Sequence, residues 1–331
     1  MQKKPLVLLF YDGFELKALP GLSGKIHSHA HSVARYLYRS AKRQQVWTGF
    51  YSAFRLLRLA LANAGCNVRV NDFAAALRQP DYPIGLAGYP SVLKKVKLPN
   101  PVIFGPGDYG FPDEAAELAS DPRIRRLIQP SSWPVKLYEP YCGAKLVTWP
   151  VGIDTGTWPN TSNDAKSVDV LVYDKIRWYR ERETSRVLEP IIRYLQDNNK
   201  TYEVIRYGHY HHVEFLRLLR RSRSMLFLCE HETQGLACQE AMACNVPVLA
   251  WDEGVLVDPE YRRFLKSELE VSSVPYFDPC CGQRFKLAEF ESVFLKFWAS
   301  LDGYAPRKYV EDRLSLARSA KDYLAIYLKR A

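Results

Sequence analysis

Two glutamates at a fixed spacing are the residues in this chain with the clearest chemical potential. Glu232 and Glu240 are separated by seven residues, and Gly235 lies between them. An apolar run at 225–228 predicts a buried strand, and residues 234–244 predict a helix that follows it. A glycine before a helix lets the backbone come close to a ligand, and the free N–H groups of the helix N-terminus suit a phosphate. The segment therefore predicts a ligand-facing helix terminus.

The elements that must position this segment alternate between strands and helices, which predicts parallel sheets covered by helices on both faces. Strands are expected at 5–11, 67–71, 101–104, 125–128, 145–148, 168–173, 202–206, 225–228 and 246–250, and helices at 50–64, 186–198, 213–222, 234–244, 286–300 and 307–329. The polar stretch 155–167 predicts a linker between two domains. Open sheets of this kind bind ligands at the carboxyl ends of their strands, so a cleft between the domains is expected.

Length and charge set the broad class. The chain has 331 residues, enough for two domains, and a formal net charge of +10, which favours anionic partners. Basic residues cluster near the N-terminus with almost no acids among them. They are Lys25, Arg35, Arg39, Lys42 and Arg43. This cluster is interpreted either as a solvated helix face or as a contact for a membrane surface or an anionic acceptor.

The cysteines and the apolar runs bear on location. There are seven cysteines, without regular CxxC spacing, and several lie inside apolar runs, which predicts thiols in a reducing compartment. The apolar run at the N-terminus is short and is interpreted as a first strand. No apolar stretch approaches 18 residues, so no membrane span is expected. We expect a cytoplasmic protein, and peripheral contact with a membrane stays open as an expectation.

The segment around the glutamate pair resembles family 4 of the glycosyltransferases, whose signature is E-G-F-G-L-x-x-x-E-A-M-A-x-G-x-P-V. This chain has Glu232, Gly235 and Leu236, then Glu240-Ala-Met-Ala and Pro247-Val. It departs at Thr233, Gln234 and Asn245, where the family has Gly, Phe and Gly. Residues 149–155, 208–228 and 315–323 are similar to further parts of the family, whereas 12–47 and 74–100 show little likeness.

The resemblance implies an α/β fold of the GT-B type, with two doubly wound Rossmann-like domains and a cleft between them. We expect an N-terminal acceptor-side domain at 1–155, a C-terminal donor-side domain at 165–305, and a C-terminal helix at 306–331 that returns to the first domain. The implied activity is retaining, metal-independent transfer of a sugar from a UDP- or GDP-sugar to a glycan or lipid-linked hydroxyl. Neither a cofactor nor a metal is expected.

Roles for the donor site follow from the resemblance. Glu240 would bind the ribose hydroxyls of the nucleotide, and Glu232 would lie near the donor sugar, as charge-assisted hydrogen bonds allow. Lys175 and Arg177, in a loop that also contains Arg180, would hold the diphosphate, whose charge develops as it leaves. Together with Glu232 they are the predicted catalytic residues. The remaining donor-side candidates are Thr233, Gln234, Gly235, Leu236, Gly208 and His209.

Three further residues are candidates for the acceptor side: Gly49, Asp108 and Tyr109. The residues His27, His29 and His31 alternate, so their rings would share one face only on a strand. Three interpretations remain open for them: a metal site, contact with an acceptor or lipid headgroup, and a plain polar loop.

Alternative functions also remain open. The chain could be a non-catalytic nucleotide- or carbohydrate-binding protein of the same fold, or a sugar-nucleotide epimerase. Nucleic-acid binding through the basic surplus has no recognisable reader motif to support it, and none is expected.

Overall fold

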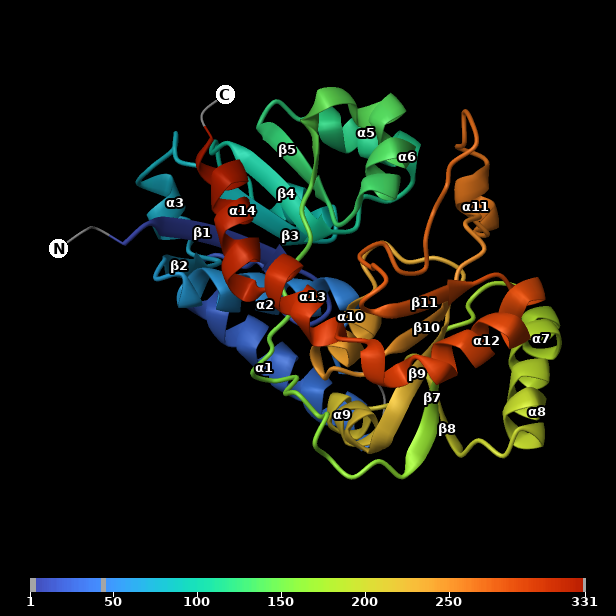
Figure 1. The fold of residues 1–331 in the computed structure, drawn as a ribbon. Coiled ribbons are helices and arrows are strands. Elements are labelled where there is room, and N and C mark those ends of the chain that lie inside the picture. The colour runs from blue at the N-terminus through green and yellow to red at the C-terminus, as the bar shows by residue number, and fades with distance from the viewer. Residues whose placement is uncertain (1–3, 43–45, 330–331) are drawn as a thin grey trace. The chain divides into compact units, whose positions relative to one another are not determined.

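The computed structural model describes residues 4–42 and 46–329, which divide into two compact units (Figure 1). Unit 1 contains the described residues up to Lys42, Val46–Gly152 and the C-terminal segment from Leu316. Unit 2 contains Ile153–Ser315. Each unit is built on its own parallel sheet, and each is described below by itself.

Unit 1 is organised around a six-stranded parallel sheet with the strand order β2-β1-β3-β4-β5-β6. The strands are β1 (Leu6–Asp12), β2 (Asn67–Val70), β3 (Ile84–Gly88), β4 (Val102–Gly107), β5 (Ile124–Gln129) and β6 (Leu146–Thr148). Its helices are α1 (Gly21–Ala41), α2 (Gly49–Asn63), α3 (Phe73–Leu77), α4 (Ser91–Lys95), α5 (Pro112–Ser120), α6 (Ser132–Cys142) and α14 (Leu316–Leu328), with a 3-10 turn at Gly143–Lys145. The chain moves outward from β1 to β2 and then crosses back to β3, so the strand order reverses beside β1.

Unit 2 repeats this plan with a five-stranded parallel sheet in the order β11-β10-β9-β7-β8. The strands are β7 (Val168–Asp174), β8 (Tyr202–Arg206), β9 (Ser222–Leu228), β10 (Val248–Trp251) and β11 (Gly282–Phe285). The helices are α7 (Arg180–Glu183), α8 (Glu189–Asp197), α9 (His212–Arg221), α10 (Leu236–Ala243), α11 (Pro259–Arg262), α12 (Phe290–Ala299) and α13 (Pro306–Arg313), with a π-helical turn at Thr184–Leu188 and 3-10 turns at Leu287–Glu289 and Leu301–Gly303. Here the order reverses between β7 and β9.

Side chains along β7 point alternately to the two faces of the sheet, so the core of unit 2 has two layers, one on each face. Val170 and Val172 pack on one face, in the layer formed with α8 and α12. Leu171 and Tyr173 pack on the other, in the layer formed with α9, α10 and α13. Because both faces are covered by helices, nearly every residue of the central strands is buried, as a parallel sheet requires.

The C-terminal helix α14 belongs to unit 1. The indole nitrogen of Trp149 donates to the backbone carbonyl of Ser319 at 2.9 Å, and its ring meets Tyr323 edge-on at 5.2 Å. The Tyr327 hydroxyl accepts from the backbone N–H of Leu8 at 3.0 Å, on β1. The single helix expected at 307–329 is wrong, because the chain breaks at 314–315 into α13, which stays in unit 2, and α14.

Several other sequence expectations need correction. Residues 21–41, for which no element bounds had been predicted, form a long helix, and the strands β3 and β11 had not been predicted. The expected linker at 155–167 is packed into unit 2, where Trp158 is buried and Thr161 bonds to the carbonyl of Cys244 at 2.8 Å. By contrast, the expectation of two doubly wound parallel α/β sheets is confirmed.

Candidate functional site

The candidate site of unit 2 lies where the strand order of its sheet reverses. Lys175 directly follows β7, and the segment from Glu230 to Glu232 directly follows the neighbouring strand β9. The N–H of Lys175 bonds to the carbonyl of Leu228 at 2.8 Å, so the two strand ends are tied together. A reversal of this kind leaves a crevice beyond the carboxyl ends of the strands, where open α/β sheets bind ligands.

A buried ion pair between Lys175 and Glu232 forms the centre of this site. Burial works against both charges, but each stabilises the other: the carboxylate raises the pKa of Lys175, and Lys175 followed by Arg177 lowers the pKa of Glu232. The ammonium group of Lys175 also lies 4.2 Å from the centre of the Tyr207 ring. The structure therefore brings together the two side chains that the sequence placed in one catalytic group.

Arg177 is held beside this pair by the loop that follows β7. Its guanidinium donates to the carbonyl of His231 at 2.8 Å and lies over the Trp178 ring at 4.1 Å. Burial opposes its charge, yet the carboxylate of Glu232 raises its pKa. Two cations thus lie next to one carboxylate, an arrangement with room for further negative charge.

Arg180, the third cation of the loop, pairs with a residue outside the Lys175–Glu232 group. It forms a two-pronged ion pair with Asp174, with nitrogen–oxygen distances of 2.5 and 2.6 Å. This pair fixes the end of β7, so the assignment of Lys175 and Arg177 to the site, in preference to Arg180, agrees with the geometry.

Glu230 and Trp178 are site residues to which sequence reasoning gave no role. The Glu230 carboxylate accepts from the backbone N–H groups of Arg177 at 3.0 Å and Trp178 at 3.2 Å, which holds the basic loop in place. The Trp178 ring stacks on His231 with centroids 4.4 Å apart. Burial, then the charge of Arg177, lowers the pKa of His231 to about 3, so this ring is neutral at pH 7. The only signal in the sequence was their position after a strand.

Glu240 contrasts with Glu232. It lies on α10 and is 8% exposed, and in the described part of the chain its carboxylate makes no hydrogen bond or ion pair. Burial raises its pKa to about 8, and the weak attraction of Lys175 offsets little of this. A buried carboxyl group without a partner is costly unless a ligand supplies one, so Glu240 marks a place for a hydrogen-bonding ligand.

The turn into α10 follows the predicted plan. Gly235 is left-handed, with a φ of 82°, and it precedes Leu236, the first helical residue. Asn245 is also left-handed at the other end of the helix, with a φ of 60°. Thr233 is exposed, whereas Gln234 is buried and its amide donates to Gln239 at 3.0 Å. Gln234 therefore helps to shape the turn.

The remaining donor-side candidates are less constrained. Gly208, left-handed with a φ of 82°, forms the turn after β8, and His209 is exposed beside it. Both follow Tyr207, whose N–H bonds to the carbonyl of Asp174 at 2.9 Å. Their contact with a nucleotide stays a prediction.

The acceptor-side candidates belong to unit 1. Gly49 is the first residue of α2, after the N-cap Thr48, and Asp108 follows β4 and accepts from the N–H of Gly110 at 3.0 Å. Tyr109 is a core residue: it is 2% exposed, and its hydroxyl bonds to the carbonyls of Phe104 and Ile128. The prediction that Tyr109 faces an acceptor is therefore wrong.

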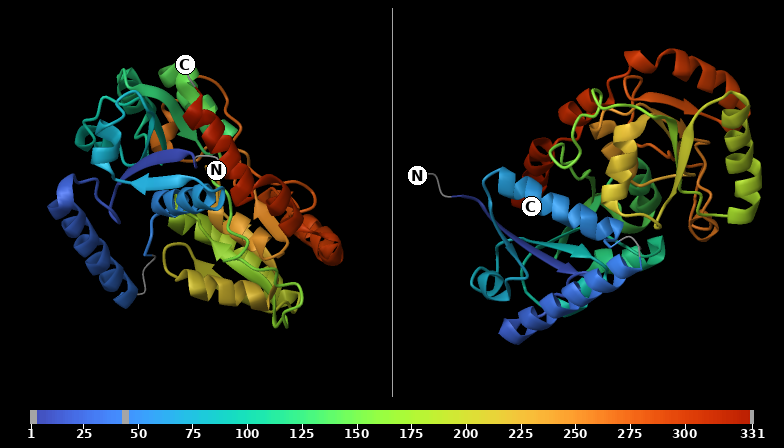
Figure 2. Two further views of the ribbon diagram at one scale, coloured as in Figure 1. Left: turned by 90° about the vertical axis from the view of Figure 1, so that its left-hand side faces the viewer. Right: turned by 90° about the horizontal axis from the view of Figure 1, so that it is seen from below.

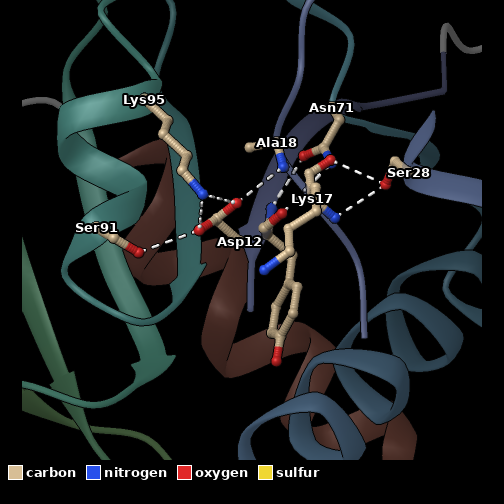
Figure 3. Close-up of polar contacts among 8 residues, drawn as sticks. Asp12, Lys17, Ala18, Ser28, Asn71, Ser91 and Lys95 are labelled. Carbon is tan, nitrogen blue, oxygen red and sulfur yellow. Dashed lines mark hydrogen bonds and ion pairs between the residues drawn. The ribbon is translucent and has the colours of Figure 1, made fainter. Parts of the chain in front are cut away.

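The strand reversal of unit 1 carries a polar cluster that had not been predicted (Figure 3). The buried Asp12 carboxylate, at the end of β1, accepts from Lys95 at 2.7 Å, from Ser91 at 3.1 Å and from the N–H of Ala18 at 3.2 Å. Asn71 bonds to Tyr11 and Lys17. Because Asp12 already has three partners, the cluster is best explained as an anchor for the loop that leads into α1.

The three histidines lie on the helix α1. His27 and His29 are exposed, and on a helix the side chain of His29 points to a different side from that of His31. The interpretation as a polar loop is wrong, and the three rings do not converge on a metal.

One other group could approach a metal within the described residues. The ligand atoms of Asp278, Cys280 and Cys281 lie within 4.8 Å of one another. The carboxylate already accepts from the N–H of Cys280 at 2.8 Å and from the thiol of Cys281 at 3.8 Å, and burial raises the pKa of both thiols. A structural zinc takes four ligands, so we assign no metal to this turn.

Comparison with known proteins supports the architecture. No protein-family model matches the chain, and no curated protein matches it. The sucrose-phosphate synthase of Thermosynechococcus elongatus resembles it with a TM-score of 0.56, 11% identity and 98% of each chain covered. A glycosyltransferase from Rickettsia africae has a TM-score of 0.52 and 13% identity, with 99% of this chain and 100% of that one covered.

Two further solved structures also resemble the chain. The lipopolysaccharide outer core galactosyltransferase WaaB has a TM-score of 0.52 and 10% identity, with 98% of this chain and 100% of that one covered. TarM has a TM-score of 0.50 and 11% identity over 78% of this chain, which covers only 57% of TarM. At such identities the likeness establishes the fold alone. The chain has the GT-B fold, as expected, whereas membership of family 4 stays a prediction.

The Lys175–Glu232 pair gives a first test. Removing either partner leaves a buried charge without its main counter-charge, so Glu232→Gln should lower the free energy of unfolding by about 3–5 kcal/mol, and Lys175→Met should lower it by less, because Arg177 still lies beside Glu232. The double variant should recover most of this loss. Denaturant unfolding of the four proteins in a double-mutant cycle measures the coupling. Additive losses would contradict the pairing.

Glu240 gives a second test. Its pKa of about 8 lies above the ordinary glutamate value of 4.5, so the folded state binds more protons than the unfolded state between these values. Stability should therefore fall as the pH rises through this window. Glu240→Gln removes the effect, and at pH 8.5 the variant should be more stable than the wild type by at least about 1.4 kcal/mol, the equivalent of one pKa unit.

Unfolding curves at pH 5.5 and 8.5 measure this difference. The gap between variant and wild type should widen with pH. The exposed Glu214, on α9, provides the matched control Glu214→Gln, which should show the same small difference at both values of pH.

Proposed function

We propose that the protein is a retaining glycosyltransferase that uses a nucleoside-diphosphate sugar. The single observation that carries the proposal is the combination in unit 2 of an unpartnered buried carboxyl group, Glu240, with the cations Lys175 and Arg177 near the reversal of a GT-B sheet. Ribose hydroxyls would donate to Glu240, and the two cations would bind the diphosphate, for which guanidinium and ammonium groups are suited.

The chemical step follows from this placement. As the bond between the anomeric carbon and the diphosphate breaks, negative charge grows on the leaving oxygen, where Lys175 and Arg177 stabilise it. The acceptor hydroxyl attacks from the same face and gives its proton to a β-phosphate oxygen, so no carboxylate nucleophile is needed. Glu232 orients Lys175 and a sugar hydroxyl. This route uses no metal, and unit 1 supplies the acceptor contacts.

The alternatives differ in what the site would need. An epimerase needs an acid–base set, and the Asp12 cluster does not offer one because its carboxylate is fully bonded. A non-catalytic binding protein would retain Glu240 but would consume no donor. The proposed location is the cytoplasm, with an acceptor that belongs to a glycan or a glycolipid.

A donor screen tests the proposal. UDP-, GDP- and other nucleotide sugars are incubated with the protein, and release of the nucleotide is followed. Glu240→Gln should weaken nucleotide binding about 10- to 100-fold, because a charged acceptor of hydroxyl bonds contributes about 1.5–3 kcal/mol. Glu232→Gln should lower kcat and leave affinity for the free nucleotide nearly unchanged, and Glu214→Gln should behave as the wild type.

The outcomes separate the alternatives. Binding without release of nucleotide would favour the binding protein. A change in the sugar with no transfer would favour the epimerase. Failure of every donor to bind would overturn both the proposed activity and the assignment of Glu240.

We further propose that α1 lies on an anionic membrane surface. Leu22, Ile26, Val33 and Leu37 are 75%, 63%, 45% and 61% exposed. At 100° per residue they fall within about 60° of one another, so they form one apolar stripe. The helix contains Lys25, Arg35 and Arg39 and no acid. It lies at the edge of unit 1 (Figure 2), and only Ser28 within it is fully buried.

Lys25 is exposed beside the stripe, whereas Arg35 lies on the side of the buried Ser28 and pairs with Glu15 at 3.7 Å. An apolar stripe flanked by a basic residue is the pattern of helices that lie in the interface of a bilayer. Within the residues that the structure describes, no helix has the length and apolar character needed to cross one. Arg43, part of the basic segment predicted from the sequence, lies outside the described residues.

Vesicle sedimentation tests the membrane contact. The protein should bind vesicles that contain phosphatidylglycerol and should bind neutral phosphatidylcholine vesicles at least tenfold more weakly. Leu22→Asp with Ile26→Asp should abolish binding, because the stripe becomes charged. Leu295→Asp, at an exposed leucine of unit 2, is the control and should have no effect. Equal binding by the α1 variant would contradict the assignment.

A further inference from the structure

A large groove in unit 1 is lined by five cations and by no carboxylate. It has a volume of about 1200 Å³, and Lys4, Arg55, Arg58, Arg69 and Arg78 contribute to its walls. These residues come from the segment before β1, from α2, from β2 and from the end of α3. The groove therefore gathers positive charge from four parts of the chain.

The groove lies at the end of the unit 1 sheet opposite to its strand reversal. Leu6 and Asn67 line it, and these are the first residues of β1 and β2. Asp12, at the opposite end of β1, is six residues further along, which corresponds to about 20 Å in an extended strand. The groove thus lies at the amino ends of the strands, whereas substrates of open α/β sheets bind at the carboxyl ends.

Four of the five cations of the groove form no ion pair within the described residues. Arg69 pairs with Asp72 at 3.3 Å, but Lys4, Arg55, Arg58 and Arg78 form none. Arg55 and Arg58 are three residues apart on α2, so their like charges repel each other. Other arginines of the chain do have acidic partners, as Arg307 has Glu311 at 2.8 Å. Within the described residues, Asp72 therefore offsets only part of the positive charge of the groove.

The shape of the groove and its other groups indicate what would offset that charge. Guanidinium groups bind phosphate oxygens in pairs of parallel hydrogen bonds. The Arg55 guanidinium is held in place by the Trp47 ring, 3.6 Å away. Asn67, Gln79 and Tyr82 add polar groups to the lining, and the volume is ample for more than one phosphate.

We propose that this groove binds a ligand with at least two phosphate groups, at a site separate from that of the sugar donor. The ligand is either a soluble polyphosphorylated molecule or a phospholipid headgroup, since both present the same chemistry. The proposal does not depend on the function proposed for unit 2, because none of the groove residues belongs to that site.

Calorimetric titration with tripolyphosphate tests the proposal, with a short-chain, water-soluble phosphatidylinositol phosphate, which carries two phosphates, as the lipid probe. The titrations use the full chain with Arg177→Ala, which weakens phosphate binding at the donor site. Adding Arg58→Ala and Arg78→Ala should weaken binding at least tenfold and reduce its dependence on salt. Because these side chains are exposed, the fold should persist, and circular dichroism verifies it.

A matched control uses Arg125→Ala with Lys136→Ala. Both residues are exposed cations of unit 1, and Arg125 lies on β5, which β1, β3 and β4 separate from β2. The control should bind within twofold of its parent. Charge reversal by Arg78→Glu should weaken binding further than Arg78→Ala does.

The two probes identify the source of the phosphate. Loss of tripolyphosphate binding in the groove variant assigns a soluble ligand, and loss confined to the lipid probe assigns a headgroup. Equal weakening by groove and control variants, or failure of both probes to bind the parent protein, would overturn the proposal. None of these results bears on donor turnover, so the two proposals stand or fall separately.

Discussion

Parallel strand pairing is the constraint on which the rest of this structure depends. Every strand of each sheet runs in the same direction, so each connection must cross over the sheet and all carboxyl ends meet at one edge. The first strand of each unit lies in the interior of its sheet, so later strands must be added on both sides of it. The strand order therefore reverses beside β1 in unit 1 and between β7 and β9 in unit 2. The loops that diverge at the second reversal carry Lys175 and Glu232, so the topology itself brings these side chains together. At the strand reversal of unit 1, the Asp12 carboxylate already accepts hydrogen bonds from Lys95, Ser91 and Ala18.

Electrostatics distinguishes the two glutamates that the sequence presented as a pair. Glu232 is ionised because Lys175 and Arg177 stabilise its charge, and its carboxylate in turn keeps the largely buried Lys175 charged. Glu240 has no such partner and is largely protonated at neutral pH, with a pKa of about 8. A ligand with hydroxyl donors would recover the cost of ionising it. The spacing of the two residues predicted their positions after a strand and on a helix. Only the surrounding charges determine which carboxyl group has a partner in the protein and which has a partner only when a ligand binds.

The sequence predicted those features that local pattern determines. Apolar runs located β7 and β9, and the Gly235 and Asn245 positions marked the ends of α10 correctly, since both adopt the left-handed conformation. It failed where tertiary contacts decide. The helix α1 contains glycine, serine and three histidines, which hide its apolar stripe, and β3 contains two glycines, so neither was predicted. Tyr109 follows β4, as a site residue would, but its side chain turns back and its hydroxyl bonds to one carbonyl of β4 and one of β5. The role of Glu230 depends on backbone N–H groups about 50 residues earlier, which no local pattern reveals.

The positive charge of the chain has a distribution that sequence reasoning could not resolve. A net charge of +10 is compatible with a uniform coat of lysine and arginine, which would favour solubility and little else. The structure instead concentrates cations in three places where they outnumber the acids beside them: along α1, around the groove between α2 and β2, and next to Glu232. Clustered cations repel one another, and folding must overcome that repulsion. Their persistence in three separate places is explained most simply by anions that bind there, and the three places differ in burial, in shape and in the apolar groups beside them. One surplus of charge can therefore serve three different ligands.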